Sequence, residues 1–162
     1  MSAPAFIVDR NVGRLARWLR MMGYDAVLFG EEGDDKMIAT ALGQGRTILT
    51  RDTGIPRRRL ATTGRLGVFL LDSDNPAEQI RRLVLGLGLD PLLAPFSRCL
   101  EDNRPLVERT RDEVASRVPP YVFKTQPEFR ECPSCHRIYW RGTHWRAMTE
   151  ELKRFAGYKK KE

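Results

Sequence analysis

Acidic side chains follow four short apolar segments of the chain. The segments are 6–8, 26–29, 47–50 and 68–71, and the acids after them are Asp9, Asp34 with Asp35, Asp52 and Asp72. If the segments are parallel strands, their carboxyl ends meet along one edge of a sheet, where open α/β sheets place active sites. Two unit charges about 5 Å apart repel by roughly 3 kcal/mol at an effective dielectric of about 20, which favours a hard cation between them. Mg²⁺ or Mn²⁺ prefers oxygen ligands and can activate water for phosphodiester hydrolysis.

Each of these acids also has a structural alternative, because an Asp after a strand often caps a helix or completes a turn. We expect Asp34 to cap the helix that follows and Asp35 to serve the site, although the two can exchange roles. Asp72 competes in the same way with Asp74, which can begin the next helix. The prediction of a metal site therefore depends on all the acids facing one edge.

The segments between these acids have the spacing of amphipathic helices. Three apolar stripes recur every three or four residues: Leu15, Trp18, Leu19 and Met22; Met37, Ile38, Ala41 and Leu42; and Ile80, Leu83, Val84 and Leu87. The expected N-caps are Asn11, Asp34 and Asn75, and the expected stops are Gly23, Gly43 or Gly45, and Gly88. Strands that alternate with such helices predict an α/β domain with a mostly parallel sheet over residues 1–92.

The charge balance favours a polyanionic partner. Lys and Arg number 28 against 21 Asp and Glu, for a net charge of +7, and the pI near 9.7 passes the threshold for suspecting a nucleic-acid ligand. No apolar stretch approaches the roughly 18–20 residues of a membrane helix, and no secretory signal is visible. We therefore expect a cytoplasmic location and no membrane association.

The second half of the chain has a different composition. Residues 93–156 contain all three cysteines and both histidines, and a stripe of Trp145, Met148, Leu152 and Phe155 predicts a closing helix. A module this small buries too little apolar surface to fold without a cross-link such as a disulfide or a bound metal. An odd cysteine count in a reducing compartment favours metal over disulfides, and a redox pair is disfavoured because no thioredoxin-like context surrounds it. Residues 157–162 are expected to form a basic tail.

Several motifs together resemble the Mut-seven C-terminal RNase domain family. They are the segment 6–20, Gly23-Tyr24-Asp25, Asp34-Asp35, Leu49-Thr50-Arg51-Asp52, Cys132-Pro133-Ser134-Cys135 and Tyr139-Trp140-Arg141-Gly142-Thr143-His144. The resemblance spans roughly residues 5–148. It implies a PIN-like (Rossmann-like) parallel sheet with flanking helices, fused to a C-terminal zinc ribbon. It also implies Mg²⁺- or Mn²⁺-dependent cleavage of single-stranded RNA.

The resemblance assigns roles to the acids and the cysteines. Asp9, Asp35 and Asp52 match the acidic positions that hold the catalytic metal, and Asp72 is a fourth catalytic candidate. The family pattern implies a second Cys-x-x-Cys upstream, but this chain has Cys99-Leu100-Glu101-Asp102 there. A structural zinc would therefore be ligated by Cys99, Asp102, Cys132 and Cys135. His136 and His144 are rival fourth ligands, and a weaker or empty site is the other alternative.

Arginines interleaved with aromatic residues around Cys132 and Cys135 suit unpaired bases and phosphates. The predicted RNA contacts are Arg14, Arg17, Arg137, Tyr139, Trp140, Arg141 and His144. Tyr139 and Trp145 can instead build the core of the ribbon. The alternative function is a non-catalytic RNA- or ribosome-binding protein on a PIN-like scaffold. A receiver-like signalling domain is disfavoured by the basic charge, and the sequence leaves the oligomeric state open.

Overall fold

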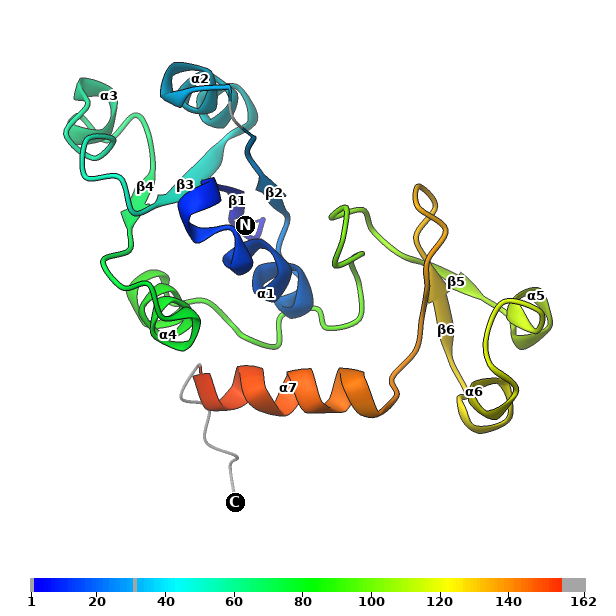
Figure 1. Cartoon of the computed structure of the whole chain (residues 1–162). Helices are drawn as coiled ribbons and strands as arrows, with labels where there is room; N and C mark the ends of the chain where they lie inside the picture. Colours follow the sequence, from blue (N-terminus) through cyan, green and yellow to red (C-terminus); the bar gives the residue numbers. More distant parts are fainter. Residues whose placement is uncertain (1, 31, 156–162) are drawn as a thin grey trace.

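A four-stranded parallel sheet forms the centre of the first part of the chain. The computed structural model describes residues 2–30 and 32–155 (Figure 1). The strands are β1 (Ala5–Val8), β2 (Ala26–Leu28), β3 (Arg46–Thr50) and β4 (Val68–Leu70). Their order is β2-β1-β3-β4, and every neighbouring pair is parallel. All four carboxyl ends therefore meet at one edge, which confirms the predicted α/β class.

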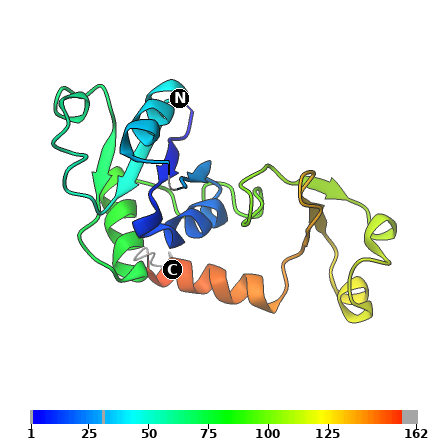
Figure 2. The ribbon, with the colours of Figure 1, turned by 45° about the horizontal axis from the view of Figure 1, so that its top comes forward.

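Helices cover both faces of this sheet (Figure 2). They are η1 (Arg10–Val12), α1 (Arg14–Met22), α2 (Asp34–Gln44), α3 (Arg59–Thr62) and α4 (Pro76–Leu87). Helices α1 and α4 share a core with Phe6, Val8 and Leu49, whereas α2 and α3 share a core with Ile7 and Ile48. Successive strand residues thus face opposite cores, as expected for a sheet that is buried on both sides.

The start of α4 agrees with the sequence. Asn75 caps the helix, and its Oδ1 accepts a hydrogen bond from the Glu78 N–H at 3.2 Å. Pro76 occupies the first helical position, where the missing N–H costs nothing. Gly88 ends the helix in the left-handed conformation with a φ of 62°, so both predicted boundaries are confirmed.

The other two predicted N-caps are wrong. Asn11 lies within the short turn η1, and α1 begins only after Gly13. Helix α2 is preceded by Gly33, whose φ of 94° favours glycine, and no side-chain hydrogen bond caps it. Asp34 is the first residue of the helix instead of its cap. Both side chains are therefore available for other interactions.

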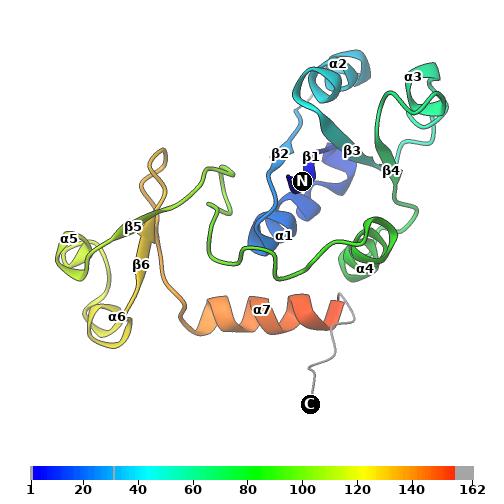
Figure 3. The same ribbon diagram turned by 180° about the vertical axis from the view of Figure 1, so that it is seen from behind.

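The second part of the chain is a small antiparallel sheet with two short helices (Figure 3). Its strands are β5 (Val107–Arg109), β6 (Phe129–Glu131) and β7 (Ile138–Tyr139), in the order β5-β6-β7. Helices α5 (Arg111–Val114) and α6 (Pro120–Thr125) lie between β5 and β6. Its hydrophobic cluster has three buried residues, Val114, Val118 and Phe129, which agrees with the expectation that this part has a small core.

Helix α7 (Thr143–Phe155) confirms the predicted closing helix and packs on the first part of the chain. Met148 and Leu152 join the core that contains α1 and α4. Trp18 of α1 and Phe155 meet edge to face, with ring centroids 5.5 Å apart. Figures 1 and 3 show α7 running from the second sheet beneath α1 and α4. The basic tail predicted at 157–162 lies outside the described residues.

Among the described residues, none of the helices is long and apolar enough to cross a membrane.

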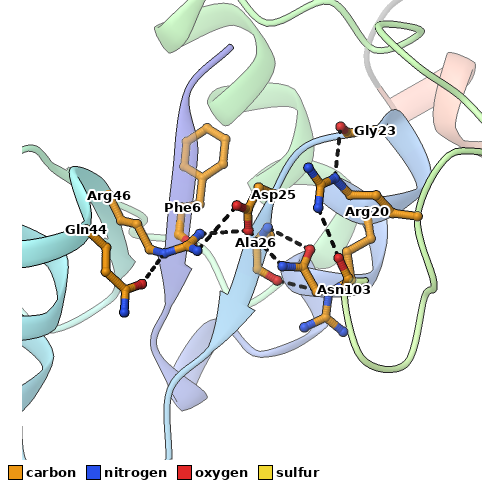
Figure 4. A network of polar contacts seen from close by, with 9 residues as sticks. Phe6, Arg20, Gly23, Asp25, Ala26, Gln44, Arg46 and Asn103 are labelled. Carbon is orange, nitrogen blue, oxygen red and sulfur yellow. Dashed lines mark hydrogen bonds and ion pairs between the residues drawn. The ribbon is translucent and has the colours of Figure 1, made fainter. Parts of the chain in front are cut away.

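A polar network attaches residues 98–103 to the start of β2 (Figure 4). Asn103 accepts a hydrogen bond from the Ala26 N–H at 3.0 Å and donates one to Asp25 Oδ1 at 2.7 Å. Arg46 binds the same carboxylate through two nitrogens, at 2.8 and 3.3 Å. Burial raises the pKa of Asp25. The hydrogen bonds from Arg46 and Asn103 together with the positive charge of Arg46 outweigh this effect, so the pKa lies below its usual value.

We predict that Asp25→Asn destabilises the protein at neutral pH and that the difference shrinks in acid. The folded-state pKa of Asp25 lies below the unfolded value of about 3.9, so its contribution is complete above that value and is lost as pH falls through the folded-state pKa. Urea unfolding between pH 7 and pH 3 measures the difference, which should be about 1–2 kcal/mol at pH 7. An identical difference at every pH would show that the charge of Asp25 contributes nothing.

Candidate active site and metal centre

A buried hydroxyl connects the acids that follow β1 and β3. Thr50 is fully buried at the end of β3. Its hydroxyl donates a hydrogen bond to Asp9 Oδ2 at 2.7 Å and accepts one from the Asp52 N–H at 2.9 Å. A neutral hydroxyl can orient a carboxylate without cancelling its charge. Thr50 therefore positions Asp9 and the backbone of Asp52 relative to each other.

The loop after β3 is fixed by bonds between side chains and backbone. Asp52 Oδ1 accepts from the Gly54 N–H at 2.8 Å. A Cβ on Gly54 would lie 3.1 Å from that oxygen, so glycine allows the turn to close tightly. Asn11 Oδ1 accepts from the Arg51 N–H at 3.2 Å. Asn11 is thus a positioning residue for this loop instead of a helix cap.

Two adjacent acids at the start of α2 have different surroundings. Partial burial raises the pKa of Asp34, and the nearby charges of Asp52 and Asp9 raise it further. The side chain of Asp35 is 90% exposed and forms an ion pair with Arg58 at 3.0 Å. The structure therefore groups Asp34, instead of the predicted Asp35, with Asp9 and Asp52.

Asp72 lies at the same edge of the sheet, beyond the outer strand β4, and forms an ion pair with Arg82 of α4. A cavity of about 760 Å³ opens beside it. Asp74 lines this cavity too, as do Arg51 and Arg81. Asp72 thus flanks the group of Asp9, Asp34 and Asp52 on the side of β4.

Ion pairs separate the flanking acids from the central ones. Asp35 and Asp72 each pair with an arginine. Within residues 2–30 and 32–155, none of Asp9, Asp34 and Asp52 has a cationic side-chain nitrogen within 4.0 Å. Three carboxylates at one edge without such a partner suit a hard divalent cation, which takes oxygen ligands. We call these three residues the acidic group.

A second cluster combines three cysteines with an aspartate. The ligand atoms of Cys99, Asp102, Cys132 and Cys135 all lie within 4.8 Å of one another. In the part of the chain that the structure describes, no other set of three or more His, Cys, Asp or Glu side chains gathers so closely. The acidic group is therefore more open than this cluster. Neither histidine joins the cluster as a ligand.

The segment that contains Cys99 and Asp102 is a tight backbone loop. The Cys99 N–H donates to the Arg104 carbonyl at 2.8 Å, and the Asn103 N–H donates to the Cys99 carbonyl at 3.0 Å. Asn103 has a positive φ of 71°, a conformation that Asn tolerates better than most residues. The loop therefore turns both side chains toward the same point.

The segment that contains Cys132 and Cys135 repeats this loop. The Cys132 N–H donates to the Arg137 carbonyl at 3.0 Å, and the His136 N–H donates to the Cys132 carbonyl at 2.9 Å. His136 has a positive φ of 63°, at the position equivalent to that of Asn103. Asp102 therefore occupies, in the first loop, the place that Cys135 occupies in the second.

The ligand atoms lie near the spacing required around a tetrahedral metal, with the Cys99–Cys135 pair within the range and the Cys132–Asp102 pair slightly closer. The Sγ atoms of Cys99 and Cys135 are 3.6 Å apart, and Cys132 Sγ lies 3.1 Å from the nearer oxygen of Asp102. Zn–S bonds of about 2.3 Å and Zn–O bonds of about 2.0 Å separate tetrahedral ligands by roughly 3.4–3.8 Å. Burial raises the pKa of Cys132 to about 12 and also raises that of Cys99. Metal binding must therefore displace protons from these thiols.

Arg20 lies beside the cluster. Its guanidinium is buried and donates to the carbonyls of Ala26 and Leu100, each at 2.9 Å. Burial lowers the pKa of Arg20, whereas the charges of Cys99 and Asp102 raise it. A metal bound by three thiolates and a carboxylate carries net negative charge. Arg20 is placed to compensate part of that charge from α1.

Five of the seven predicted RNA-binding residues line one groove of about 790 Å³. They are Arg17, Arg137, Tyr139, Trp140 and His144. We call this the aromatic groove.

Two further predicted residues lie outside it. Arg14 is exposed on α1, and the guanidinium of Arg141 lies over the ring of Phe96, 4.9 Å from its centroid.

A parallel sheet with an acidic edge and a separate cysteine cluster define an α/β protein with two candidate metal centres. A family model, the Mut7-C RNAse domain, matches residues 4–152. The chain belongs to this family, which confirms the resemblance seen in the sequence and indicates a nuclease-like function. Comparisons with curated proteins and with solved structures gave no significant match.

Sequence reasoning missed the roles of Thr50, Asn11 and Arg20. Thr50 ends an apolar strand immediately before Arg51 and Asp52. A polar residue in the last buried position of a strand was therefore the one local signal for its role. The contacts of Asn11 and Arg20 are made to residues 40 and 80 positions away. No local pattern can indicate contacts at that separation.

We predict that the purified protein binds about one zinc ion per chain and that Asp102→Cys retains it. The loop already places residue 102 opposite Cys132, so a thiolate can replace the carboxylate without a change of backbone. Asp102→Ala should weaken binding by at least about tenfold, the scale found even for partners outside the ligand shell. Zinc analysis after equilibration with a graded chelator measures this. Equal zinc retention by Asp102→Ala would show that Asp102 is not a ligand.

Proposed function

We propose that this protein is a metal-dependent ribonuclease that hydrolyses phosphodiester bonds of single-stranded RNA. The observation that supports the proposal most directly is the acidic group, whose three carboxylates gather at the carboxyl edge of a parallel sheet without an arginine partner among the described residues. Open α/β sheets bind their ligands at this edge. Membership of the Mut7-C RNAse domain family supports the same reaction.

In this proposal Asp9, Asp34 and Asp52 hold Mg²⁺ or Mn²⁺. The ion would supply an activated water and stabilise the leaving oxygen. Thr50 orients Asp9 through its hydroxyl, and the Gly54 N–H fixes one oxygen of Asp52. Partial burial and the charges of the two neighbouring carboxylates together raise the pKa of Asp34.

The flanking acids are assigned a different part in the reaction. Asp35 holds Arg58, and Asp72 holds Arg82, on the two sides of the acidic group. Arginines at these positions suit the phosphates of an RNA strand that crosses the edge. Asp35 and Asp72 are therefore positioning residues in this proposal, whereas the sequence favoured them as direct members of the site.

The cysteine cluster is assigned a structural zinc, which makes the second part of the chain a zinc-ribbon module with an RNA-binding role. Paired loops with matching hydrogen bonds support this assignment. Zinc would supplement the small hydrophobic cluster of this part, in which Val114, Val118 and Phe129 are the buried residues. The aromatic groove lies next to these loops and supports the role in RNA binding.

We predict that Asp9→Asn, Asp34→Asn and Asp52→Asn each lower Mn²⁺-dependent cleavage of single-stranded RNA by at least about 100-fold. Loss of one carboxylate removes a charge that holds the ion, and the loss of a single stabilising group in an active site typically costs about 10²–10³ in rate. Cleavage of a labelled oligoribonucleotide, followed with time on a gel, measures the effect.

The matched control is Asp35→Asn, because it makes the same chemical change at the adjacent residue of α2. We expect its rate to fall by no more than about fivefold, because it loses the exposed ion pair that positions Arg58 but no proposed ligand of the ion. Equal losses in Asp34→Asn and Asp35→Asn would contradict the assignment of Asp34. RNA binding without metal-dependent cleavage in the wild-type protein would favour the alternative of a non-catalytic RNA-binding protein.

We also predict that Mn²⁺ stabilises the wild-type protein but not Asp34→Asn. The pKa of Asp34 is raised in the folded state, so its ionisation at neutral pH destabilises the metal-free fold and Asp34→Asn should melt slightly higher without metal. A tenfold excess of Mn²⁺ over its Kd should add about 1.4 kcal/mol, or about 3–6 °C, to the wild-type protein. Calorimetry with and without Mn²⁺ measures both effects, and an unchanged Mn²⁺ shift in Asp34→Asn would contradict the site.

A further inference from the structure

We infer that the aromatic groove binds unpaired bases of single-stranded RNA and holds the strand while its continuation reaches the acidic group. This inference rests on the proposed function and specifies where and how the substrate is recognised. The groove has a volume of about 790 Å³. Its walls come from α1, residues 100–101, α6, β7 and the first turns of α7. It is therefore assembled from both parts of the chain.

Aromatic side chains provide the stacking surfaces. Tyr121, on α6, is 76% exposed although it lines the groove. Trp140 and Trp145 line it as well, and both are only partly buried. A large aromatic side chain left so exposed as Tyr121 contributes little to the folded core. Every base has a π-face, and stacking of one base on an aromatic ring is sequence-tolerant and favourable.

Cationic side chains give the groove a charge that is complementary to phosphate. Arg137 and Arg146 line it, and within the described residues neither guanidinium has a carboxylate partner within 4.0 Å. Arg17 also lines it and is paired with Glu101 at 2.7 Å. Two arginines without an acidic partner beside exposed aromatic rings match a strand of bases and phosphates. An apolar peptide would leave these charges unpaired.

The cysteine cluster supports one wall of the groove. The hydroxyl of Tyr139 lies 3.1 Å from Cys99 Sγ and accepts a hydrogen bond from the Leu100 N–H at 3.1 Å. Both Tyr139 and Leu100 line the groove. The cysteine loops therefore set the position of residues that contact the bound strand.

The groove lies within a few nucleotides of the acidic group. Arg17 is on α1, and only η1 and the first turn of α1 separate it from Asp9. At about 2.0 Å per residue in a 3₁₀ turn and 1.5 Å in an α-helix, that span is at most about 15 Å. Arg14 is exposed on the same helix between them. A strand held in the groove can thus pass along α1 to the acidic edge.

The test measures binding of a fluorescent single-stranded octaribonucleotide to the full chain in the Asp9→Asn background without added Mg²⁺ or Mn²⁺, which prevents cleavage. Tyr121→Ala should weaken binding by about 5- to 100-fold, the range for loss of one stacked base, whereas Tyr121→Phe should bind as the parent does. Arg137→Ala should lower the dependence of log affinity on log salt by about 0.7, the value for one phosphate of a single strand. Because Tyr121 and Arg137 are exposed, neither change should affect folding, and melting curves check this.

Arg65→Ala is the matched control, because it removes an exposed arginine that lies outside the groove and precedes β4, at the edge of the sheet opposite the acidic group. Unchanged affinity in both Tyr121→Ala and Arg137→Ala would overturn the inference, even if cleavage still requires Asp34. The inference would also fail if duplex RNA or polyglutamate competed as well as the single strand, since neither presents unpaired bases. If Tyr121→Ala weakens binding but the wild-type protein does not cleave RNA with Mn²⁺, the result supports RNA binding by the aromatic groove and contradicts the proposed ribonuclease activity.

Discussion

Repulsion between carboxylates at one edge of the sheet is the constraint around which the first part of this protein is arranged. Parallel strands in the order β2-β1-β3-β4 bring their terminal acids together. Partial burial, together with the charges of Asp52 and Asp9, raises the pKa of Asp34. Arginines neutralise the outer acids, Asp35 and Asp72. The inner acids Asp9 and Asp52 accept hydrogen bonds from neutral donors, the Thr50 hydroxyl and the Gly54 N–H. This division leaves negative charge at the centre, which is the condition that a cation site requires and an ion-pair network does not.

The second constraint is the attachment between the two parts of the chain. Asn103 and Arg20 join the loop around Cys99 to β2 and α1. Helix α7 then returns to the first core through Met148 and Leu152. The small antiparallel sheet is thus held at both of its ends, although it has little core of its own. A groove with walls from both parts keeps a defined shape only under this condition, so the attachment matters for recognition as well as for stability.

The sequence predicted what depends on local periodicity and failed where tertiary contacts decide. The parallel sheet, the cap at Asn75 and the helix that contains Met148 follow from apolar spacing and cap chemistry, and the structure confirms them. Asp34 is not the predicted cap, because Gly33 occupies that position with a positive φ. The groove wall at Tyr121 had no periodic signal, since α6 has only six residues and begins at a proline. Which of two neighbouring acids faces a site is likewise decided by the direction of the first helical turn, which composition does not encode.

The aspartate in the cysteine cluster shows that the backbone of the two loops is matched even where the side chains differ. The loop around Cys99 keeps the same two hydrogen bonds and the same positive φ as the loop around Cys132, although it has one cysteine fewer. A carboxylate carries the same charge as a thiolate, so the net charge facing Arg20 is unchanged by the replacement. Burial raises the pKa of Asp102, but hydrogen bonds from the Arg104 N–H and the neighbouring thiols bring it below its usual value, so the carboxylate is ionised. The loop with aspartate therefore keeps the backbone geometry and the negative charge of a cysteine loop and differs in one candidate ligand atom, and zinc can accept either oxygen or sulfur there.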